Sequence, residues 1–442
     1  MSGEDKLEPT LEDAAEQGNA VIEDDAGGLN DAPKGMRVHI AFYGRRNVGK
    51  SSLINAITRQ QTAIVSDIPG TTTDPVEKTM EMLPLGPVLL VDTAGIDDVG
   101  VLGQARVERT RKVLDSTDLA IVAIEPGIWG EFEDGIVSEL EARKVPYVIA
   151  ITKRDICQPE KAFVDSLPKS ASSVVNVSST TREGIQELKD ALVYAAPEEM
   201  VEEPQILADL IPEHGLAVLV IPVDKQAPKG RLILPQVQTI RDLLDGHCSA
   251  LVVQDDELER ALGMLSRKPD IVVTDSQAFA QVAAVVPEDI PMTGFSVLFA
   301  RFKGDFPSLV HGAGALDALQ PGDRVLIAES CAHHPIQDDI GTVKIPRLLQ
   351  ENVCPDLKID HCQGTLFPDD LSEYKVVIHC GACMLNRKAM RNRIAMCENA
   401  GVAITNYGMT IAHALGILPR ALRPFEGAND IYEQARREQT AA

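Results

Sequence analysis

The segment Gly44–Ser51, GRRNVGKS, has the pattern G-x-x-x-x-G-K-S/T, and no other feature constrains the fold of this chain as strongly. It follows an apolar run, Val38–Tyr43, and precedes Ser51–Ile57, in which apolar residues share one helical face. A glycine-rich turn between a strand and a helix directs backbone N–H groups and a helix N-terminus toward a phosphate. The sequence therefore predicts a nucleotide site at this turn.

Apolar runs typical of strands recur after the turn and alternate with helical stretches. They are Val88–Val91, Leu119–Ile124 and Tyr147–Ile151. This alternation predicts a doubly wound parallel sheet with helices on both faces. Within it, Lys50 is expected to reach the β- and γ-phosphates, and Ser51 is expected to bind Mg²⁺.

Three later segments indicate that the nucleotide is GTP: Asp92–Gly95, Thr152–Asp155 and Ser178–Thr180, the last at the place of the final guanine-contacting loop. Asp92 ends an apolar run and is followed by Thr93-Ala94-Gly95, so we expect Asp92 to bind Mg²⁺ through water and Gly95 to sense the γ-phosphate. In the segment Thr152–Asp155, the carboxylate of Asp155 can accept from both guanine N1–H and N2–H₂, which adenine does not offer. Thr152 stands where such motifs usually carry Asn, which weakens the predicted bracing of the loop. The predicted nucleotide and Mg²⁺ contacts are Gly44, Asn47, Val48, Gly49, Lys50, Ser51, Ser52, Thr72, Asp92, Thr152, Lys153, Asp155, Ser178 and Ser179.

Two residues of this set are expected to act in GTP hydrolysis by resemblance to known GTPases. Thr72 lies in a Gly-Thr-Thr segment that resembles the Gly-Thr-Thr-Arg-Asp switch, although Thr73 replaces the arginine, and it would bind Mg²⁺ in the GTP state. Asn47 resembles the asparagine that helps hold K⁺ in potassium-activated GTPases. Ile96, after Gly95, is apolar and cannot orient a water. We therefore expect K⁺-stimulated hydrolysis, with catalytic residues Lys50, Asn47, Thr72, Asp92 and Gly95.

The length of 442 residues predicts about three domains. Residues 1–34 carry ten acidic and two basic residues, which indicates a disordered tail. After it we expect a nucleotide unit and a second unit with strands at Leu216–Ile221, Ala250–Val253, Ile271–Val273 and Ser296–Phe299. The predicted boundaries are 1–35 for the acidic tail, 36–197 for the GTP-binding domain, 204–300 and 301–425 for the next two domains, and 426–442 for a C-terminal tail.

The net charge of −24 argues against a surface that binds nucleic acid or an anionic membrane. No apolar stretch is long enough to span a bilayer, and the N-terminus has no signal-peptide pattern, so a cytoplasmic location is expected. Eight cysteines without a signal indicate a reducing compartment, in which thiols bind metals or react.

Two clusters of cysteine and histidine follow predicted strands in the last third of the chain. They are Cys331-Ala332-His333-His334 after Arg324–Ile327, and His379-Cys380-Gly381-Ala382-Cys383 after Lys375–Ile378, and both are expected at one edge of a sheet. Gly381 and a predicted helix start at Met384 would direct N–H groups toward the thiolates. The spacing alone leaves open tetrahedral zinc, an iron–sulfur cluster or a redox pair.

The other cysteines carry weaker expectations. Cys157 and Cys248 are predicted to be buried and structural, because each stands alone in its domain. For Cys354, Cys362 and Cys397, nothing in the spacing distinguishes a ligand from a packing residue.

The combination of the GTPase motifs with both cysteine clusters resembles the maturation GTPases of [FeFe]-hydrogenases over residues 36–425. The fold class is then α/β: a P-loop GTPase domain with a doubly wound sheet, an α/β dimerisation domain and an α/β iron–sulfur cluster-binding domain. The resemblance implies a [4Fe–4S] cluster on Cys331, Cys380 and Cys383. It implies a weakly held fourth site at His379, His333 or Asp338.

The same resemblance implies a scaffold function. The protein would receive a transient di-iron precursor built with two radical-SAM maturases, hold it beside the cluster and deliver it to apo-[FeFe]-hydrogenase. GTP would govern partner association, and the middle domain would form a homodimer. The alternatives are an RNA- or ribosome-associated GTPase with a structural zinc domain, and a thiol redox regulator that uses Cys380 and Cys383.

Overall fold

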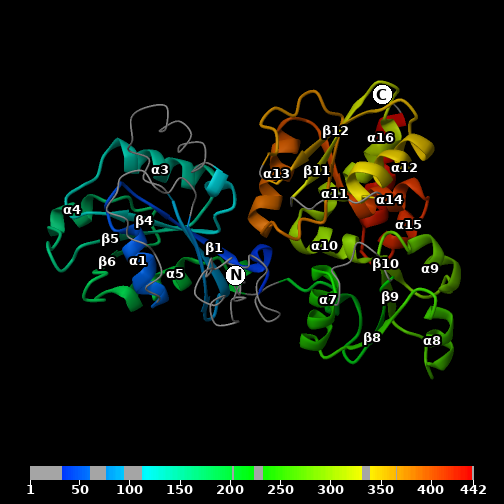
Figure 1. Ribbon diagram of the computed structural model, residues 1–442, viewed down its shortest axis with the longest axis horizontal. Coiled ribbons are helices and arrows are strands. Elements are labelled where there is room, and N and C mark those ends of the chain that lie inside the picture. The colour runs from blue at the N-terminus through cyan, green and yellow to red at the C-terminus, as the bar shows by residue number, and fades with distance from the viewer. Residues whose placement is uncertain are drawn as a thin grey trace, which may run out of the picture.

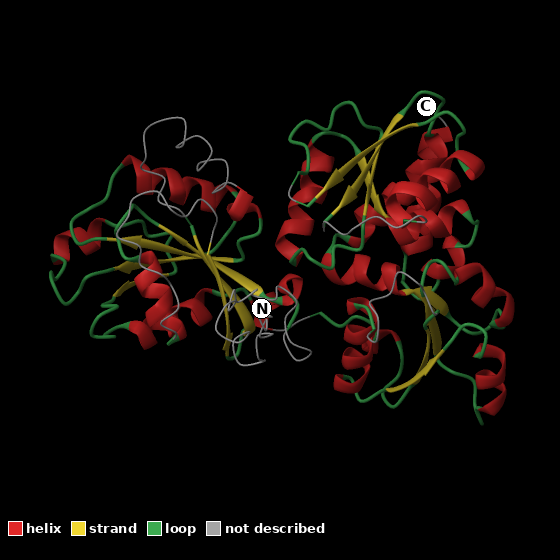
Figure 2. Ribbon diagram, viewed as in Figure 1, coloured by secondary structure: helices red, strands yellow, loops and turns green. Residues whose placement is uncertain are grey.

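The computed structural model describes residues 32–59, 76–93, 112–201, 204–222, 232–330, 339–364 and 366–440. Over these residues the chain forms three α/β units, each built on its own sheet (Figures 1 and 2). No helix in these ranges is long and apolar enough to cross a membrane. The predicted acidic tail lies outside the described residues as far as residue 31.

The first unit contains a mainly parallel sheet with the strand order β2-β3-β1-β4-β5-β6. Its central strands are buried on both faces, as expected where helices cover both sides of a parallel sheet. The edge strand β2 is antiparallel to β3, and from Glu77 onward its exposed residues alternate with buried or half-buried ones. The elements are η1 Lys34–Met36, β1 Val38–Tyr43, α1 Lys50–Thr58, β2 Val76–Met82, β3 Gly86–Asp92, β4 Leu119–Ile124, α3 Glu131–Ala142, β5 Tyr147–Ile151, α4 Lys161–Ser166, β6 Ser173–Asn176, α5 Ile185–Ala195 and α6 Glu198–Val201.

The second unit is a parallel sheet of order β10-β9-β7-β8. The strand predicted at Ser296–Phe299 is wrong, because these residues lie in helix α10. This helix is buried on nearly every side, and its short run of large apolar residues, Val297–Phe299, resembles a buried strand in the sequence. The elements are η2 Ala208–Leu210, β7 Leu216–Val220, α7 Leu234–Asp245, β8 Ser249–Val253, α8 Leu258–Met264, β9 Ile271–Thr274, α9 Phe279–Val285, β10 Met292–Gly294 and α10 Phe295–Lys303.

The third unit is a parallel sheet of order β12-β11-β13-β14. Helix α13 begins at Arg387 instead of the predicted Met384, because the side chain of Asn386 caps it by accepting from the Ala389 N–H at 3.1 Å. The elements are α11 Phe306–Gly314, η3 Ala315–Ala318, β11 Arg324–Glu329, η4 Ile340–Lys344, α12 Ile345–Asn352, β12 Lys358–Gln363, β13 Val376–His379, α13 Arg387–Asn399, β14 Ala403–Asn406, α14 Tyr407–Ala414, α15 Leu418–Leu422 and α16 Ala428–Thr440.

The predicted tails are shorter than expected at both ends. Residues 426–442 were expected to form a C-terminal tail, but helix α16 buries Ala428, Tyr432 and Ala435, which follow each other at helical spacing and pack against α11. At the other end, η1 is ordered and Gly35 is buried, although the predicted tail reaches residue 35.

The three units are connected differently. A single apolar core runs through the second and third units, from Ile206 to Tyr432. The first unit has two cores of its own, one on each face of its sheet. Figure 1 shows the first unit beside the other two, with α13 of the third unit facing it.

Candidate functional site

The phosphate loop runs from β1 to α1 and requires glycine at its first position. Gly44 has φ +151°, and a Cβ built on it would lie 2.3 Å from the carbonyl oxygen of Ala123. Lys50, the first residue of α1, is buried, and its Nζ donates to the carbonyls of Gly44 at 2.8 Å and Arg45 at 2.9 Å. The ammonium group therefore lies inside the loop, where a bound phosphate would meet it.

The carboxyl end of β3 places the carboxylate of Asp92 beside this loop. Ser51 Oγ donates to the carboxylate of Asp92, and Thr93 Oγ1 donates to the carbonyl of Phe42 at 2.5 Å. Burial raises the pKa of Asp92, against the hydrogen bond from Ser51 and the charge of Lys50. A serine hydroxyl and a carboxylate in contact are oxygen ligands of the kind that Mg²⁺ takes.

The residues predicted to bind the base lie at the carboxyl ends of β5 and β6. Thr152 Oγ1 donates to the carbonyl of Val48 at 2.8 Å, so the threonine in place of asparagine braces the phosphate loop. The Lys153 ammonium pairs with Glu125 at 2.5 Å, and Asp155 is exposed. Ser178 Oγ accepts from the Thr181 N–H at 3.0 Å. Ser179 follows it and is half-buried.

The remaining residues predicted for nucleotide binding and hydrolysis lie partly inside and partly outside the described ranges. Asn47 and Ser52 are exposed, whereas Val48 is buried. Asn47 has φ +58°, a left-handed conformation that asparagine tolerates. Thr72 and Gly95 lie outside the described residues.

One contact of the phosphate loop was not predicted from the sequence. The Arg45 guanidinium makes a two-bond pair with the buried Glu133 of α3, at 2.8 Å for each bond. Glu133 also accepts from the Gly130 N–H at 3.0 Å. Because the two residues are far apart in the sequence, no local pattern could have revealed this support of the loop.

The second candidate site lies at the carboxyl end of the third sheet. Strands β11 and β13 are parallel neighbours, and Ala328 lies opposite His379. Ser330, which precedes Cys331, therefore lies beside Cys380: its N–H is 3.2 Å and its Oγ is 2.8 Å from Cys380 Sγ. Burial raises the pKa of the Cys380 thiol, and hydrogen bonds from Ser330 and from the Ala382 backbone oppose this effect.

His379 is fully buried, and both of its ring nitrogens are engaged. Nδ1 donates to the carbonyl of Cys380 at 2.8 Å, and Nε2 accepts from Arg393 Nη1 at 2.7 Å. Burial first, and then the Arg393 charge, lower the pKa of His379 to about 3. In this conformation the imidazole is neutral and offers no free nitrogen.

Lys303 holds the loop from Cys380 to Leu385, which we call the cysteine loop. The Lys303 Nζ donates to the carbonyls of Ala382 at 2.9 Å and Leu385 at 2.8 Å. Burial lowers the pKa of Lys303 to about 8, and the nearby thiols of Cys383 and Cys380 oppose this shift.

The other cysteines differ in their surroundings. Cys248 is buried as predicted, but Cys157 is exposed, because it lies in a surface turn beyond the end of β5. Cys354 and Cys397 belong to apolar cores. Cys362 is half-buried, and burial raises the pKa of its thiol to about 11.

The donor set fits an iron–sulfur cluster as far as it is described. Cys380 and Cys383 lie in one loop, and Cys380 already receives hydrogen bonds at its sulfur, as cluster thiolates do. Cys331, His333 and Asp338 lie outside the described residues, and within the described ranges no three His, Cys, Asp or Glu side chains converge as a metal site.

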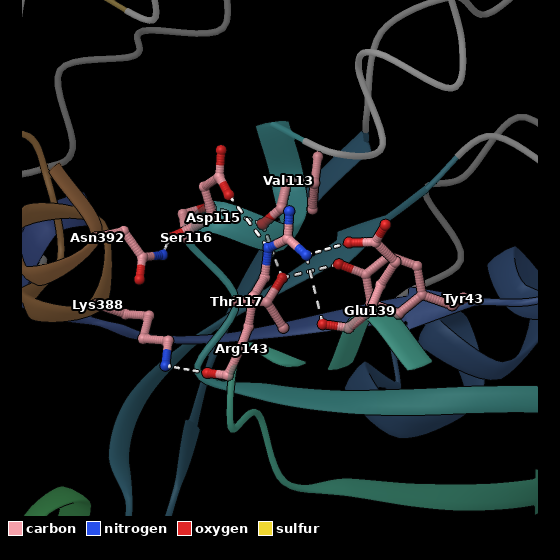
Figure 3. A network of polar contacts seen from close by, with 9 residues as sticks. All are labelled: Tyr43, Val113, Asp115, Ser116, Thr117, Glu139, Arg143, Lys388 and Asn392. Atoms are coloured by element: carbon pink, nitrogen blue, oxygen red, sulfur yellow. Dashed lines mark hydrogen bonds and ion pairs between the residues drawn. The ribbon is translucent and has the colours of Figure 1, made fainter. Parts of the chain in front are cut away.

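Helix α13 follows the cysteine loop and contacts the first unit, and Figure 3 shows the contacts that Lys388 and Asn392 make there. Asn386 Nδ2 donates to the carbonyl of Ser116 at 2.7 Å and to Asp118 Oδ2 at 2.8 Å. Further along the helix, Lys388 Nζ donates to the carbonyl of Arg143 at 2.7 Å, and Asn392 Nδ2 donates to that of Asp115 at 2.5 Å. We call these four hydrogen bonds the α13 contact.

The α13 contact is continuous with the start of the phosphate loop. Thr117, between Ser116 and Asp118, bonds through its Oγ1 to the hydroxyl of Tyr43 at 2.8 Å. Tyr43 is the last residue of β1 and directly precedes Gly44 (Figure 3). A chain of hydrogen bonds and short backbone segments therefore connects the two candidate sites.

Comparison with known families identifies the second and third units. Residues 206–304 match the hydrogen maturase F dimerization domain, and residues 307–424 match the hydrogen maturase F tetramerization domain. The chain belongs to the hydrogen maturase F (HydF) family. Residues 39–153 of this HydF-family chain match the family described as 50S ribosome-binding GTPase. These matches confirm the predicted fold class, and the two HydF domains support self-association.

Curated relatives of this HydF-family chain match over a part of their length. The tRNA modification GTPase MnmE of Methylobacterium radiotolerans is 38% identical over 173 residues, which are 38% of this chain and 36% of the relative. MnmE of Synechococcus elongatus is 35% identical over 199 residues, which are 43% of each chain. The chain thus spans less than half of the length of these relatives.

Solved structures are similar over a comparable share of the HydF-family chain. The G domain of the T. maritima FeoB iron transporter is 28% identical, covers 36% of this chain and 99% of its own, and has a TM-score of 0.28. Aquifex aeolicus Era is 22% identical, covers 49% of this chain and 94% of its own, and has a TM-score of 0.33.

Proposed function

We propose that this HydF-family protein is a GTP-binding scaffold that holds a di-iron subcluster precursor beside a [4Fe–4S] cluster and transfers it to apo-[FeFe]-hydrogenase. The observation that carries the proposal is the position of Cys380 and Cys383. They lie at the sheet edge where β11 also ends, beside Ser330, which directly precedes Cys331 in the sequence. This edge lies within residues that match a HydF domain.

The cluster ligands in this proposal are Cys331, Cys380 and Cys383. The cluster, when bound, supplies an iron with an exchangeable position at which the di-iron cargo can be attached. The engaged nitrogens of His379 favour His333 or Asp338 as the group at that fourth position. His379 would then orient the loop by holding the carbonyl of Cys380.

GTP binding and hydrolysis belong to the first unit in this proposal. Lys50 contacts the β- and γ-phosphates, while Ser51, Asp92 and Thr72 hold Mg²⁺. The base is read by Asp155, with Lys153, Ser178 and Ser179 beside it. Asn47 is exposed on the loop, as a residue that holds K⁺ at the phosphates must be, and Gly95 senses the γ-phosphate.

The nucleotide acts as a switch for partner association. The α13 contact supports this role, because it joins the strand end that precedes the phosphate loop to the helix that follows the cysteine loop. The partners are two radical-SAM maturases and apo-[FeFe]-hydrogenase, in the cytoplasm. Residues 204–300 form the homodimer, which the match to a dimerization domain supports.

Anaerobic purification tests the cluster directly. The wild-type protein should be brown and contain iron and sulfide. The Cys331→Ser, Cys380→Ser and Cys383→Ser variants should each lose the colour and retain GTP turnover. Cys157→Ser is the matched control, because that thiol is exposed in the first unit and should keep the colour.

The Lys50→Ala variant should show the converse result, with a coloured protein that no longer hydrolyses GTP. A colourless wild-type protein that contains zinc would contradict the scaffold proposal. It would favour a ribosome-linked GTPase with a structural zinc domain, an alternative that the HydF matches of residues 206–424 do not support.

A further inference from the structure

Lys303 is a buried cation at the junction of the second and third units. It is the last residue of α10, and only 1% of its surface is exposed. Lysine is rarely buried to this degree without an anionic partner, because the charged form loses its hydration. The contacts of Lys303 therefore require an explanation.

The acceptors of the Lys303 ammonium all come from the cysteine loop. Its Nζ donates to the carbonyls of Ala382 at 2.9 Å and Leu385 at 2.8 Å, with Cys383 O at 3.4 Å. Among the described residues, no carboxylate pairs with it. The three donors of the ammonium are thus satisfied by neutral carbonyls, and the groups that favour its charged form are the thiols of Cys383 and Cys380 in the same loop.

The cysteine loop directs backbone acceptors toward Lys303 and a backbone donor toward the thiol of Cys380. Its carbonyls face the ammonium, whereas the N–H of Ala382 reaches the Cys380 sulfur. Ala382 has φ +52°, an uncommon conformation for a residue with a Cβ, and such strain persists only where the surroundings enforce it. Lys303 provides that constraint from one side.

The first unit closes the other side of the same loop. A Cβ built on Gly35 would lie 2.4 Å from the carbonyl oxygen of Cys383 and 3.0 Å from Lys303 Nζ. The backbone at Gly35 therefore excludes water from the ammonium. In a site with little water, the field of a charge is screened weakly and acts strongly on its neighbours.

We propose that Lys303 is a positioning residue for the iron–sulfur site: it holds the Cys380–Cys383 loop through the loop carbonyls and places a positive charge beside the anionic cluster. This inference rests on the proposed function. A cluster with three thiolate ligands is anionic and gains one more negative charge on reduction. A fixed cation beside it therefore favours the reduced form and raises the reduction potential.

Two substitutions separate the charge from the hydrogen bonds. Lys303→Gln removes the charge but retains two N–H donors, whereas Lys303→Met removes both. The midpoint potential is measured by redox titration of the EPR signal of the reduced cluster, and iron release is measured with a chelator in excess. Lys268→Gln is the matched control, because that ammonium pairs with Asp289 on the exposed surface of the second unit.

Both Lys303 variants should have a midpoint potential below that of the wild type. Lys303→Met should also release iron about 10-fold to 100-fold faster, as expected when an outer partner of a metal site is lost. Lys268→Gln should match the wild type in both measurements. A folded Lys303→Gln dimer that retains no cluster would also support the holding role.

The inference is overturned if Lys303→Gln holds a cluster at the wild-type potential, or if Lys303→Met releases iron at the wild-type rate. If Lys303→Met does not fold, Lys303→Gln decides alone. A wild-type protein without a reducible cluster would overturn the proposed function together with this inference. A wild-type cluster with unaffected variants would overturn the inference only.

Discussion

Single residues in this protein perform tasks that their neighbours in the sequence do not reveal. Asn386 is the clearest example: its Oδ1 caps α13, while its Nδ2 holds the first unit through Ser116 and Asp118. Gly44 is another, because its backbone conformation and the nearby Ala123 carbonyl both exclude a side chain. Each of these roles belongs to identified atoms of one residue, so single substitutions can test it.

The substitution Gly44→Ala should destabilise the first unit and weaken GTP binding. The added Cβ collides with the Ala123 carbonyl, and the strained backbone alone costs about 1–3 kcal/mol of unfolding free energy. Chemical denaturation and nucleotide titration measure the two effects. The control is Gly135→Ala within α3, where nothing lies within 4 Å of the new Cβ and stability should rise by about 0.5–1 kcal/mol. Equal effects of both substitutions would contradict this account of the loop.

The strands were predictable where both of their faces are buried by their own unit. Val38–Tyr43, Leu119–Ile124 and Tyr147–Ile151 have the predicted bounds, because a continuous apolar run with turns at its ends has few alternatives. The prediction for helix α10 failed, because this helix is buried on nearly every side in the core of the second and third units, and its short apolar run resembles a buried strand. The phosphate loop was predicted from a local motif. The contacts of Glu133 with Arg45 and of Lys303 with Ala382 were not predicted, because the partners are distant in the sequence.

The N-terminus of α13 allows a test at the scale of one element. Asn386→Ala removes a helix cap, worth about 1 kcal/mol, and buried hydrogen bonds, worth about 1 kcal/mol each. Asn386→Ser keeps an oxygen for the cap but cannot reach the first unit as the amide does. We expect the alanine variant to lose more unfolding free energy than the serine variant. Denaturant titrations measure the difference, and equal losses would mean that the cap contributes nothing.

At the scale of the whole molecule, the α13 contact is polar and narrow, whereas the second and third units share one apolar core. The first unit also packs Met36 against that core, so a change in its docking would break a limited set of contacts and would not require either partner to unfold. This is what a nucleotide switch requires, since a ligand can shift only an equilibrium between states of similar free energy.

The double substitution Lys388→Met with Asn392→Ala should uncouple the nucleotide from the cluster. In the wild type, we expect the rate of iron release to a chelator to differ between the GTP-bound and GDP-bound protein. In the variant the two rates should become equal, because the helix no longer follows the first unit. Arg391→Ala is the control, since its exposed pair with Glu199 contributes little. A variant that keeps the wild-type ratio of rates would show that the signal travels elsewhere.

The continuous core between residues 206–304 and 307–424 has a geometric consequence for any assembly of this protein. Two copies joined through the former segment carry the latter as a rigid extension. The distance between the two cysteine loops of such a pair is therefore fixed by the subunit interface and not by a flexible tether. A partner that engages both loops at once would have to match that spacing.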